Sequence, residues 1–474
     1  MPINVICSHA VAEQCAKPSK AFKYSLPKSY TAGALKPLVG AGSLIIREGE
    51  EWKATRKSFN PGFAPTHLAS LLPLIVDRTK TFLAKLDEKA KSGEEFPFES
   101  LCTMITFDII GAVALNMNMN AQAPRSQQHP IVRGYADLIA MFGGGSPAAI
   151  PIQNPLKVWR RNKISNNVDF EIKQAVRKTY DEMGSKKTQG ETTDGRSIVE
   201  LALRDVDQLT PDKLQEVADQ VKSFMFAGHD TTSTLLQWIF YLLSLHPQVR
   251  DTLFKELDDI FGPDSSPDDV ATQLLERGEV VTKQLHYTSA IIKETLRFYP
   301  PAGSARIVPK EDAFMVTDPR TGESVPLYGI TYLCHWLIHR DKSVYGPTAN
   351  QWVPERWLGN TDTSMDTNED AKVSEKGGDP SSIPITAWRP FERGPRNCIG
   401  QELANLEARV IVACAARKYQ LEKTGLGERE LSEKSGGILD ENGVFKTKSN
   451  LYTMHRVTFK PIDGMMGRII LVRR

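Results

Sequence analysis

The stretch Phe391-Glu392-Arg393-Gly394-Pro395-Arg396-Asn397-Cys398-Ile399-Gly400 decides the fold of this chain. A thiolate that binds a metal needs an apolar ring against solvent and backbone N–H groups directed at its sulfur, and glycines let the backbone approach closely. A segment with helical apolar spacing, residues 401–418, follows directly, and the dipole of a helix N-terminus stabilises a thiolate. The stretch therefore predicts that Cys398 is a metal ligand.

Upstream, residues 211–245 have the apolar spacing of one long helix. Thr210 is a good N-cap, Pro211 suits the first helical position, and His246-Pro247 ends the run. Such a helix is about 50 Å long and must cross the molecule. Its middle, residues 227–234, is rich in hydroxyl and β-branched side chains that favour helix poorly, which indicates a functional segment.

Two shorter patterns place arginines beside possible partners. Glu294 and Arg297 are three residues apart on a predicted helix, where they can pair, and Arg356 follows about 60 residues later in Trp-Val-Pro-Glu-Arg-Trp. Trp52 and Arg56 are four residues apart, so both could donate hydrogen bonds to carboxylates from one helix face. A surface ion pair and an ordinary surface helix are the plain alternatives.

Together these motifs resemble cytochromes P450, because F-x-x-G-x-R-x-C-x-G is present at every fixed position and the E-x-x-R, P-E-R-W and A-G-x-D-T-T segments precede it in the family's order. The resemblance extends from about Leu35 to Arg474, with Lys460-Pro-x-x-Gly464 near the end. It implies a mainly α fold with small β-sheets (α+β), in which haem lies between the long central helix and the cysteine loop.

The resemblance also assigns roles to individual residues. Cys398 would be the axial ligand of the haem iron, and the other cofactor-binding residues would be Trp52, Arg56, Phe391, Gly394, Arg396 and Gly400. Among these, Phe391 would shield the sulfur, and Arg396, Trp52 and Arg56 would reach the propionates. Glu294, Arg297 and Arg356 would form a buried structural network, a task that suits the forked arginine side chain. Asp230 and Thr231 would be catalytic, as a relay for the protons that oxygen activation consumes.

Composition limits the classes of partner. Lys+Arg 59 against Asp+Glu 57 gives a formal charge of +2, so no nucleic-acid partner is expected. Six cysteines without C-x-x-C spacing are typical of reduced thiols in an intracellular protein. The most apolar stretch, residues 104–115, contains Asp108, and no transmembrane span or secretory signal is expected. Attachment to a membrane surface remains open.

The rest of the sequence predicts one domain, residues 1–474, since no internal repeat or linker separates two halves. Helices are expected at residues 73–90, 101–115, 166–182, 211–245, 248–261, 285–298 and 401–418, and strands at 44–47, 313–317, 455–460 and 468–472. Polar stretches at 184–196, 360–382 and 425–443 are expected loops. Only about 50 residues precede Trp52, so we expect the family's N-terminal anchor and first helix to be missing.

The resemblance predicts an enzyme, a haem-thiolate monooxygenase that inserts one atom of O2 into an apolar small molecule. Haem b would be the cofactor, O2 a co-substrate, and NADPH would act only indirectly through NADPH-cytochrome P450 reductase. The amino-acid sequence of the loop is similar to that of eukaryotic microsomal and fungal members of the family. This similarity suggests secondary-metabolite biosynthesis at the surface of the endoplasmic reticulum. The alternatives are a haem-thiolate isomerase or dehydratase, and an inactive truncated haem-binding remnant.

Weaker patterns favour other sites less well. Cys334, His335 and His339 could ligate zinc, but a histidine pair without an acidic partner is more often structural. Gly40 and Gly42, and the glycines at 143–145, lack the strand-then-helix frame of a dinucleotide loop. Substrate contacts are expected after Tyr30, at residues 135–159, 224–227 and 302–307, and near Asn450.

Overall fold

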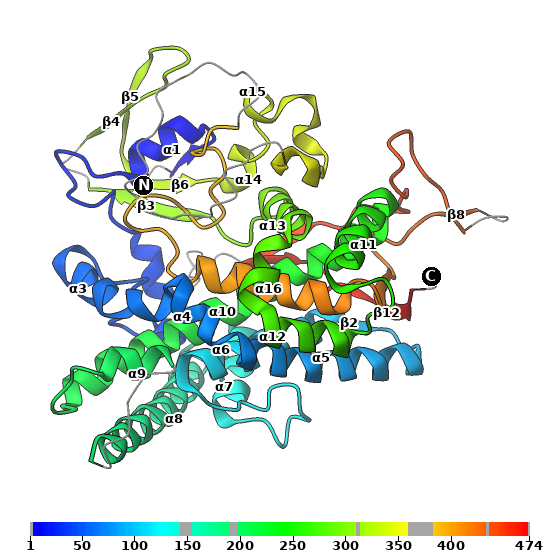
Figure 1. Cartoon of the computed structure of the whole chain (residues 1–474). Coiled ribbons are helices and arrows are strands. Elements are labelled where there is room, and N and C mark those ends of the chain that lie inside the picture. Colours follow the sequence, from blue (N-terminus) through cyan, green and yellow to red (C-terminus); the bar gives the residue numbers. More distant parts are fainter. Residues whose placement is uncertain are drawn as a thin grey trace. The chain divides into compact units, whose positions relative to one another are not determined.

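The computed structural model describes residues 3–142, 154–188, 197–309, 313–358, 383–432 and 436–472. The chain forms two compact units, each built from two stretches that are distant in sequence (Figure 1). Unit 1 comprises residues 1–30 and 289–398, and unit 2 comprises residues 31–288 and 399–474. The sequence predicted a single domain over residues 1–474, and this stays a prediction.

Helices make up most of unit 2. Their bounds are α2 (Lys36–Val39), α3 (Gly49–Phe59), α4 (Pro65–Ser70), α5 (Leu72–Ser92), α6 (Phe98–Leu115), α7 (Pro130–Met141), α8 (Pro155–Thr188), α9 (Ile198–Leu203), α10 (Pro211–Leu245), α11 (Pro247–Phe261), α12 (Pro267–Gln284) and α16 (Gln401–Ala415). Helix α13 (His286–Phe298) begins in unit 2 and continues into unit 1. Short 3-10 turns lie at Tyr30–Leu35 and Asn60–Phe63.

The long helix α10 has the predicted bounds and is the centre of unit 2. The Thr210 hydroxyl accepts a hydrogen bond from the Lys213 N–H at 3.2 Å, which caps the start. Helix α6 lies along it (Figure 1), and Gly228 allows this approach because an added Cβ would lie 2.8 Å from Cγ1 of Ile110. The Thr103 and Ser233 hydroxyls join the two helices at 2.9 Å.

Small antiparallel sheets complete unit 2. Strand β12 (Met466–Leu471) lies between β2 (Phe96–Pro97) and β7 (Tyr419–Lys423), with Ile469 opposite Leu421. Strands β10 (Thr453–Arg456) and β11 (Thr458–Pro461) form a hairpin, and β8 (Leu431–Ser432) pairs with β9 (Gly436–Gly437). The β10–β11 turn is at Val457, whose φ is +81°.

Unit 1 contains a three-stranded sheet in the order β1 (Ile3–Ile6), β6 (Gly329–Leu333), β3 (Ser304–Val308) and a hairpin of β4 (Phe314–Thr317) with β5 (Ser324–Leu327). Strand β1 runs parallel to β6 and β3 runs antiparallel to it. Helices α1 (His9–Ala16), α14 (His335–Ile338) and α15 (Lys342–Tyr345) and 3-10 turns at Gly346–Asn350 and Pro354–Trp357 complete it. Its apolar core joins α1 to the strands through Val11, Cys15, Val308, Val316 and Leu333.

The predicted mainly α fold with small sheets is confirmed, and a helix is present at each predicted position. The helix predicted at 166–182 is longer than expected at both ends, since α8 spans Pro155–Thr188. The strand expected at residues 44–47 is wrong, because the N–H groups of Ile46 and Arg47 both donate to the carbonyl of Ser43 and close a turn. Residues 455–460 form two strands where one was expected, and β8 and β9 lie in the loop expected at 425–443. The loop expected at 360–382 and the glycines at 143–145 lie outside the described residues.

Helix α6 is the one helix of the described residues that is long and apolar enough to cross a membrane, and 78% of it is buried in the protein. Its one acidic residue past the first turn, Asp108, accepts hydrogen bonds from the N–H groups of Ala121 and Gln122 at 2.8 and 3.2 Å. A helix covered in this way has the setting of a core helix.

Candidate functional site

The cysteine loop of unit 1 is closed by hydrogen bonds of its own backbone. The Cys398 N–H donates to the Phe391 carbonyl at 2.8 Å, and the Asn397 N–H donates to the Gly394 carbonyl at 3.0 Å. Gly394 has a φ of +72°, and a Cβ there would lie 2.3 Å from the carbonyl oxygen of Ala16. Only glycine fits this position, both for its φ and for the close approach.

Cys398 differs in its accessibility from the three buried cysteines of the chain. Cys15, Cys102 and Cys414 are buried, and burial raises the thiol pKa of Cys15 and Cys414 to about 12 and that of Cys102 well above its ordinary value. A buried thiol of this kind resists ionisation, whereas a metal ligand must be a thiolate. Cys398 is exposed, at the end of a loop that its backbone fixes. It therefore suits a ligand better than these three.

The other predicted residues of the loop lie around Cys398. The ring of Phe391 packs edge-on against Trp388 at 6.0 Å, and the Trp388 indole donates to the Lys293 carbonyl at 3.0 Å. Arg396 is buried, at 7% exposure. Gly400 is the N-cap of α16, where its carbonyl accepts from the Ala404 N–H at 3.0 Å.

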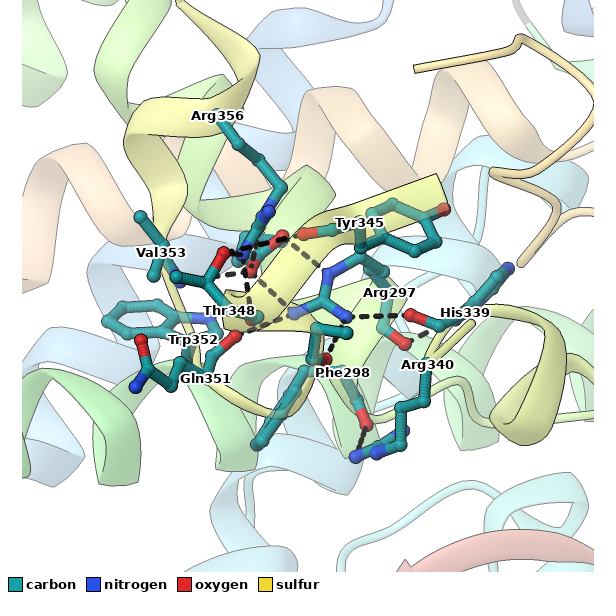
Figure 2. A network of polar contacts seen from close by, with 12 residues as sticks. Arg297, Phe298, His339, Arg340, Tyr345, Thr348, Gln351, Trp352, Val353 and Arg356 are labelled. Atoms are coloured by element: carbon teal, nitrogen blue, oxygen red, sulfur yellow. Dashed lines mark hydrogen bonds and ion pairs between the residues drawn. The ribbon is translucent and has the colours of Figure 1, made fainter. Parts of the chain in front are cut away.

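The structure brings Glu294, Arg297 and Arg356 together in unit 1. Figure 2 labels the two arginines of this network. The Glu294 carboxylate is fully buried and accepts two hydrogen bonds from Arg297, at 2.7 and 2.8 Å, and one from Arg356 Nε at 3.0 Å. The Trp357 indole and the Val353 N–H each add a hydrogen bond at 2.9 Å. A buried carboxylate is costly unless it is paired and hydrogen-bonded, and here both oxygens are satisfied.

Arg297 connects this carboxylate to three backbone carbonyls. One terminal nitrogen donates to the carbonyls of His339 and Ala349 at 2.7 and 2.8 Å, and the other donates to Gln351 at 2.7 Å (Figure 2). The guanidinium is fully buried, and each of its five N–H groups donates to one of these acceptors. The network therefore fixes α13 to the segment that carries the second arginine.

In unit 2, Asp230 points from the middle of α10 to the C-terminal hairpin. Its Oδ1 lies 2.5 Å from the ammonium of Lys460, and its Oδ2 accepts from the Thr458 hydroxyl at 2.6 Å. Lys460 also donates to Glu99 of α6 at 2.9 Å. Asp230 and Lys460 are both buried, and the pKa of Lys460 is raised, because its attraction to the two carboxylates exceeds the opposing cost of burial. Asp230 thus acts as a hydrogen-bond acceptor in this arrangement.

Thr231, the next residue, has a different setting. Its hydroxyl donates to the carbonyl of Ala227 at 2.8 Å, which leaves the oxygen able to accept from a further group. Ala227 and Thr231 share one helix face and are only partly buried, whereas Asp230 and Thr232 are buried. The two residues of the predicted relay therefore leave the helix in different directions.

Trp52 and Arg56 lie on α3 as expected, in unit 2. Trp52 is 5% exposed, and Arg56 Nε donates to the side chain of Asn60 at 2.9 Å. Their i, i+4 spacing places both side chains on one face of this helix.

A buried carboxyl that the sequence did not single out lies next to this part of α10. Glu407 of α16 is 2% exposed and is hydrogen-bonded to the Thr232 hydroxyl. Burial raises the pKa of Glu407 to about 8, and the hydrogen bond opposes this rise only in part. A carboxyl with this pKa carries a proton at neutral pH.

The zinc alternative at Cys334, His335 and His339 is not supported by the contacts of the histidines. His339 uses both ring nitrogens, one with the Arg297 carbonyl at 3.1 Å and one with the Arg389 N–H at 3.0 Å. His335 Nδ1 lies 2.9 Å from the carbonyl of Ala302. No group of three or more His, Cys, Asp or Glu side chains in the described part of the chain could hold a metal ion.

Sequence reasoning missed charged residues whose partners are distant in the chain. In unit 1 they are Glu13, Arg306, Arg389, Glu392 and Arg393. In unit 2 they are Lys460 and Glu407, which contact α10, and Glu99, which contacts Lys460. A buried glutamate in a loop or an apolar helix is a signal in itself, because such a group requires a partner. The sequence alone does not name that partner.

Comparison with known proteins gives one family. A sequence model of the family described as cytochrome P450 matches residues 1–448. Cytochrome P450 monooxygenase acrF of Aspergillus aculeatus is 32% identical over 442 residues, which are 91% of this chain and 84% of that protein.

Two further relatives are similar over most of the chain. Cytochrome P450 monooxygenase polC of Polytolypa hystricis is 31% identical over 403 residues, which are 82% of this chain and 66% of that protein. Cytochrome P450 4V2 of Homo sapiens is 27% identical over 444 residues, which are 89% of this chain and 76% of that protein.

Arg297→Lys is expected to destabilise the protein by about 3 kcal/mol or more, because it leaves buried acceptors without donors. Lysine has three N–H donors on one nitrogen and cannot reproduce the fork. Denaturant unfolding of wild type and variant measures the loss. Arg320→Lys is the control, since Arg320 is 55% exposed and pairs with Asp318 at 3.0 Å. Equal losses in the two variants would contradict the role of the network.

Glu407→Gln is expected to flatten the pH dependence of stability. Between pH 4.5 and about 8 the folded protein keeps a proton on Glu407 that the unfolded chain has released, so the contribution of Glu407 to stability is full below pH 4.5 and falls as pH rises to about 8. Glutamine cannot ionise and should remove this fall, at most about 1.4 kcal/mol per pH unit. Thermal unfolding across this range tests it, with exposed Glu279→Gln as the control. A slope unchanged from wild type would contradict the buried proton.

Proposed function

The chain belongs to the cytochrome P450 family, and from that premise we propose that it is a haem-thiolate monooxygenase acting on an apolar small molecule. Members of this family are oxidoreductases that incorporate oxygen from O2. The observation that carries the proposal is the Cys398 thiol, which is exposed and stands on a loop closed by its own backbone. This is the arrangement that an axial thiolate ligand requires.

The residues that would hold haem b are those expected from the sequence. Cys398 would ligate the iron, Phe391 would shield the sulfur, and Gly394 and Gly400 would let the backbone follow its path around it. Arg396 and the Trp52–Arg56 pair would donate to the propionates, which accept such charge-assisted hydrogen bonds. Bound haem supplies the iron centre at which O2 is reduced, and the protein determines how that centre is oriented and protonated.

Proton supply is the part that we assign to α10. Thr231 is suited to it, because the residue is only partly buried and its hydroxyl can accept one hydrogen bond while donating another. Asp230 would supply or replace a proton only after Lys460 or Thr458 moves away, since both of its oxygens are engaged by these groups. The Asp230 carboxylate therefore acts behind the hydroxyl in this proposal.

The partners follow from the same proposal. Electrons would come from NADPH through NADPH-cytochrome P450 reductase, and the chain itself would bind no nicotinamide. Similarity to two fungal monooxygenases supports a role in secondary-metabolite biosynthesis. We propose the surface of the endoplasmic reticulum as its location.

Cys398→Ala is expected to abolish the absorption band that a thiolate-ligated ferrous haem gives with carbon monoxide, because the ligand atom is removed. Difference spectra of the reduced protein measure the band. Cys7→Ala is the matched control, since Cys7 is another exposed thiol of unit 1. A band that survives in Cys398→Ala would place the ligand on another residue and overturn the assignment.

Thr231→Ala is expected to keep substrate binding and NADPH consumption while less of the reduced oxygen enters product and more leaves as hydrogen peroxide. The cause is the loss of the accessible hydroxyl that orders the proton supply. The measurement is product formed per NADPH oxidised, with peroxide counted in parallel. Thr234→Ala is the control, because its buried hydroxyl also donates to a helix carbonyl, that of Asp230, at 3.0 Å. A coupling ratio unchanged in Thr231→Ala would remove this role, and product formed without O2 would favour the isomerase alternative.

A further inference from the structure

Four charged residues of unit 1 join the cysteine loop to the first helix, α1. We call Glu13, Arg389, Glu392 and Arg393 the α1 clamp. Glu13 is on α1, and the other three belong to the segment that leads into the loop. None of the four occupies a fixed position of the family motif, since Glu392 and Arg393 are at its variable positions.

The inner half of the clamp is the pair of Arg389 and Glu392. Two nitrogens of Arg389 donate to Glu392 Oε1, at 2.7 and 3.1 Å, and Arg389 is 1% exposed. Oε2 of Glu392 lies 3.7 Å from His335 and 3.9 Å from Arg306. Burial alone would raise the pKa of Glu392, but its contacts with His335, Arg389 and Arg306 hold the pKa well below its usual range.

The outer half of the clamp is Glu13. Its Oε2 accepts from Arg393 Nε at 3.2 Å and lies 3.7 Å from Arg389. Arg389 also donates to the α1 carbonyls of His9 and Ala12, at 3.3 and 3.4 Å. The Glu13 side chain is only 9% exposed, so both arginines meet it in a largely dry setting where charge-assisted hydrogen bonds are strong.

The clamp holds a backbone path that does not form readily by itself. Glu392 has a φ of +59°, which a side chain with a Cβ rarely adopts, and Gly394 has a φ of +72° against the carbonyl of Ala16. A positive φ at a residue other than glycine costs free energy and persists where surrounding contacts impose it. At Glu392 these contacts are the hydrogen bonds from Arg389 in the clamp, together with the approach of His335 and Arg306 to its other oxygen.

Both residues with positive φ lie inside the turn that presents Cys398. The Cys398 N–H bonds to Phe391, directly before Glu392, and the Asn397 N–H bonds to Gly394 itself. A shift of the backbone at residues 392–394 therefore changes both hydrogen bonds that close the loop. The position of the sulfur depends on the clamp through these two bonds.

We propose that Glu13 is a positioning residue for the Cys398 thiol and acts on it through Arg389 and Arg393. The proposal rests on the proposed role of Cys398 as iron ligand. In this proposal, helix α1 at residues 9–16 supports the loop that carries Cys398, although the two are distant in sequence.

The test uses the full haem-loaded protein and the variants Glu13→Gln, Arg393→Gln and the double variant. The measurement is the rate at which the ferrous carbon monoxide complex loses its thiolate-type band in mild denaturant. Each single variant is expected to lose it about tenfold faster, the effect of one lost charge-assisted hydrogen bond. The double variant should be no faster than the faster single variant, because the two residues act as one contact.

Lys17→Gln is the matched control, because the Lys17 ammonium lies 3.2 Å from the other oxygen of Glu13 and its side chain is 56% exposed. Its rate should stay within about twofold of wild type, as for a surface pair. A wild-type rate in Glu13→Gln, or effects that add in the double variant, would overturn the proposal.

Amide hydrogen exchange of Asn397 and Cys398 provides a second readout that does not depend on the iron. Both amides should exchange faster in Glu13→Gln and in Arg393→Gln than in wild type or Lys17→Gln. If Glu13→Gln gives no folded protein, Arg393→Gln decides, since its side chain is 27% exposed and less essential to folding. A wild type without the thiolate band would overturn the proposed function, and exchange would then still decide whether the clamp holds the loop.

Discussion

A charged group buried in a protein must be paired, and this requirement organises both units. In unit 1 the carboxylate of Glu294 has lost all contact with water, and five donors from four residues surround it. The residues that supply them lie on α13 and in the segment at 351–357, so satisfying one carboxylate fixes the relative position of two distant parts of the chain. In unit 2 Asp230 has the same effect on α10 and β11.

How much of the fold could be predicted depended on whether local sequence determined each element. Helix α10 was predicted with its observed bounds, because Thr210 caps it and a proline follows His246. Residues 44–46 are apolar and the segment 44–47 resembles a strand. It forms a turn because the carbonyl of Ser43 accepts from two N–H groups and Gln220 accepts from Leu44. Helix α12 was missed since its apolar positions are fewer and its backbone is kinked at Arg277.

In the candidate site, too, local sequence determined some residues and not others. Residues that belong to a motif could be named from sequence, and the structure brings Glu294, Arg297 and Arg356 together as the motif implies. Residues such as Glu13, Lys460 and Glu407 could not be named, because each finds its partner hundreds of residues away or on another helix and no spacing records it. Asp230 was identified, but its side chain turns towards the hairpin for the same reason.

The tie between α10 and the C-terminal hairpin has a consequence for the order in which this protein can be made. Thr458 lies 228 residues after Asp230, so a ribosome completes the central helix long before it releases the groups that neutralise the buried carboxylate. Until then the native burial of Asp230 costs several kcal/mol, as for any unpaired interior charge. The nascent helix must keep this face in water or on a chaperone, and native closure of unit 2 becomes a post-translational event.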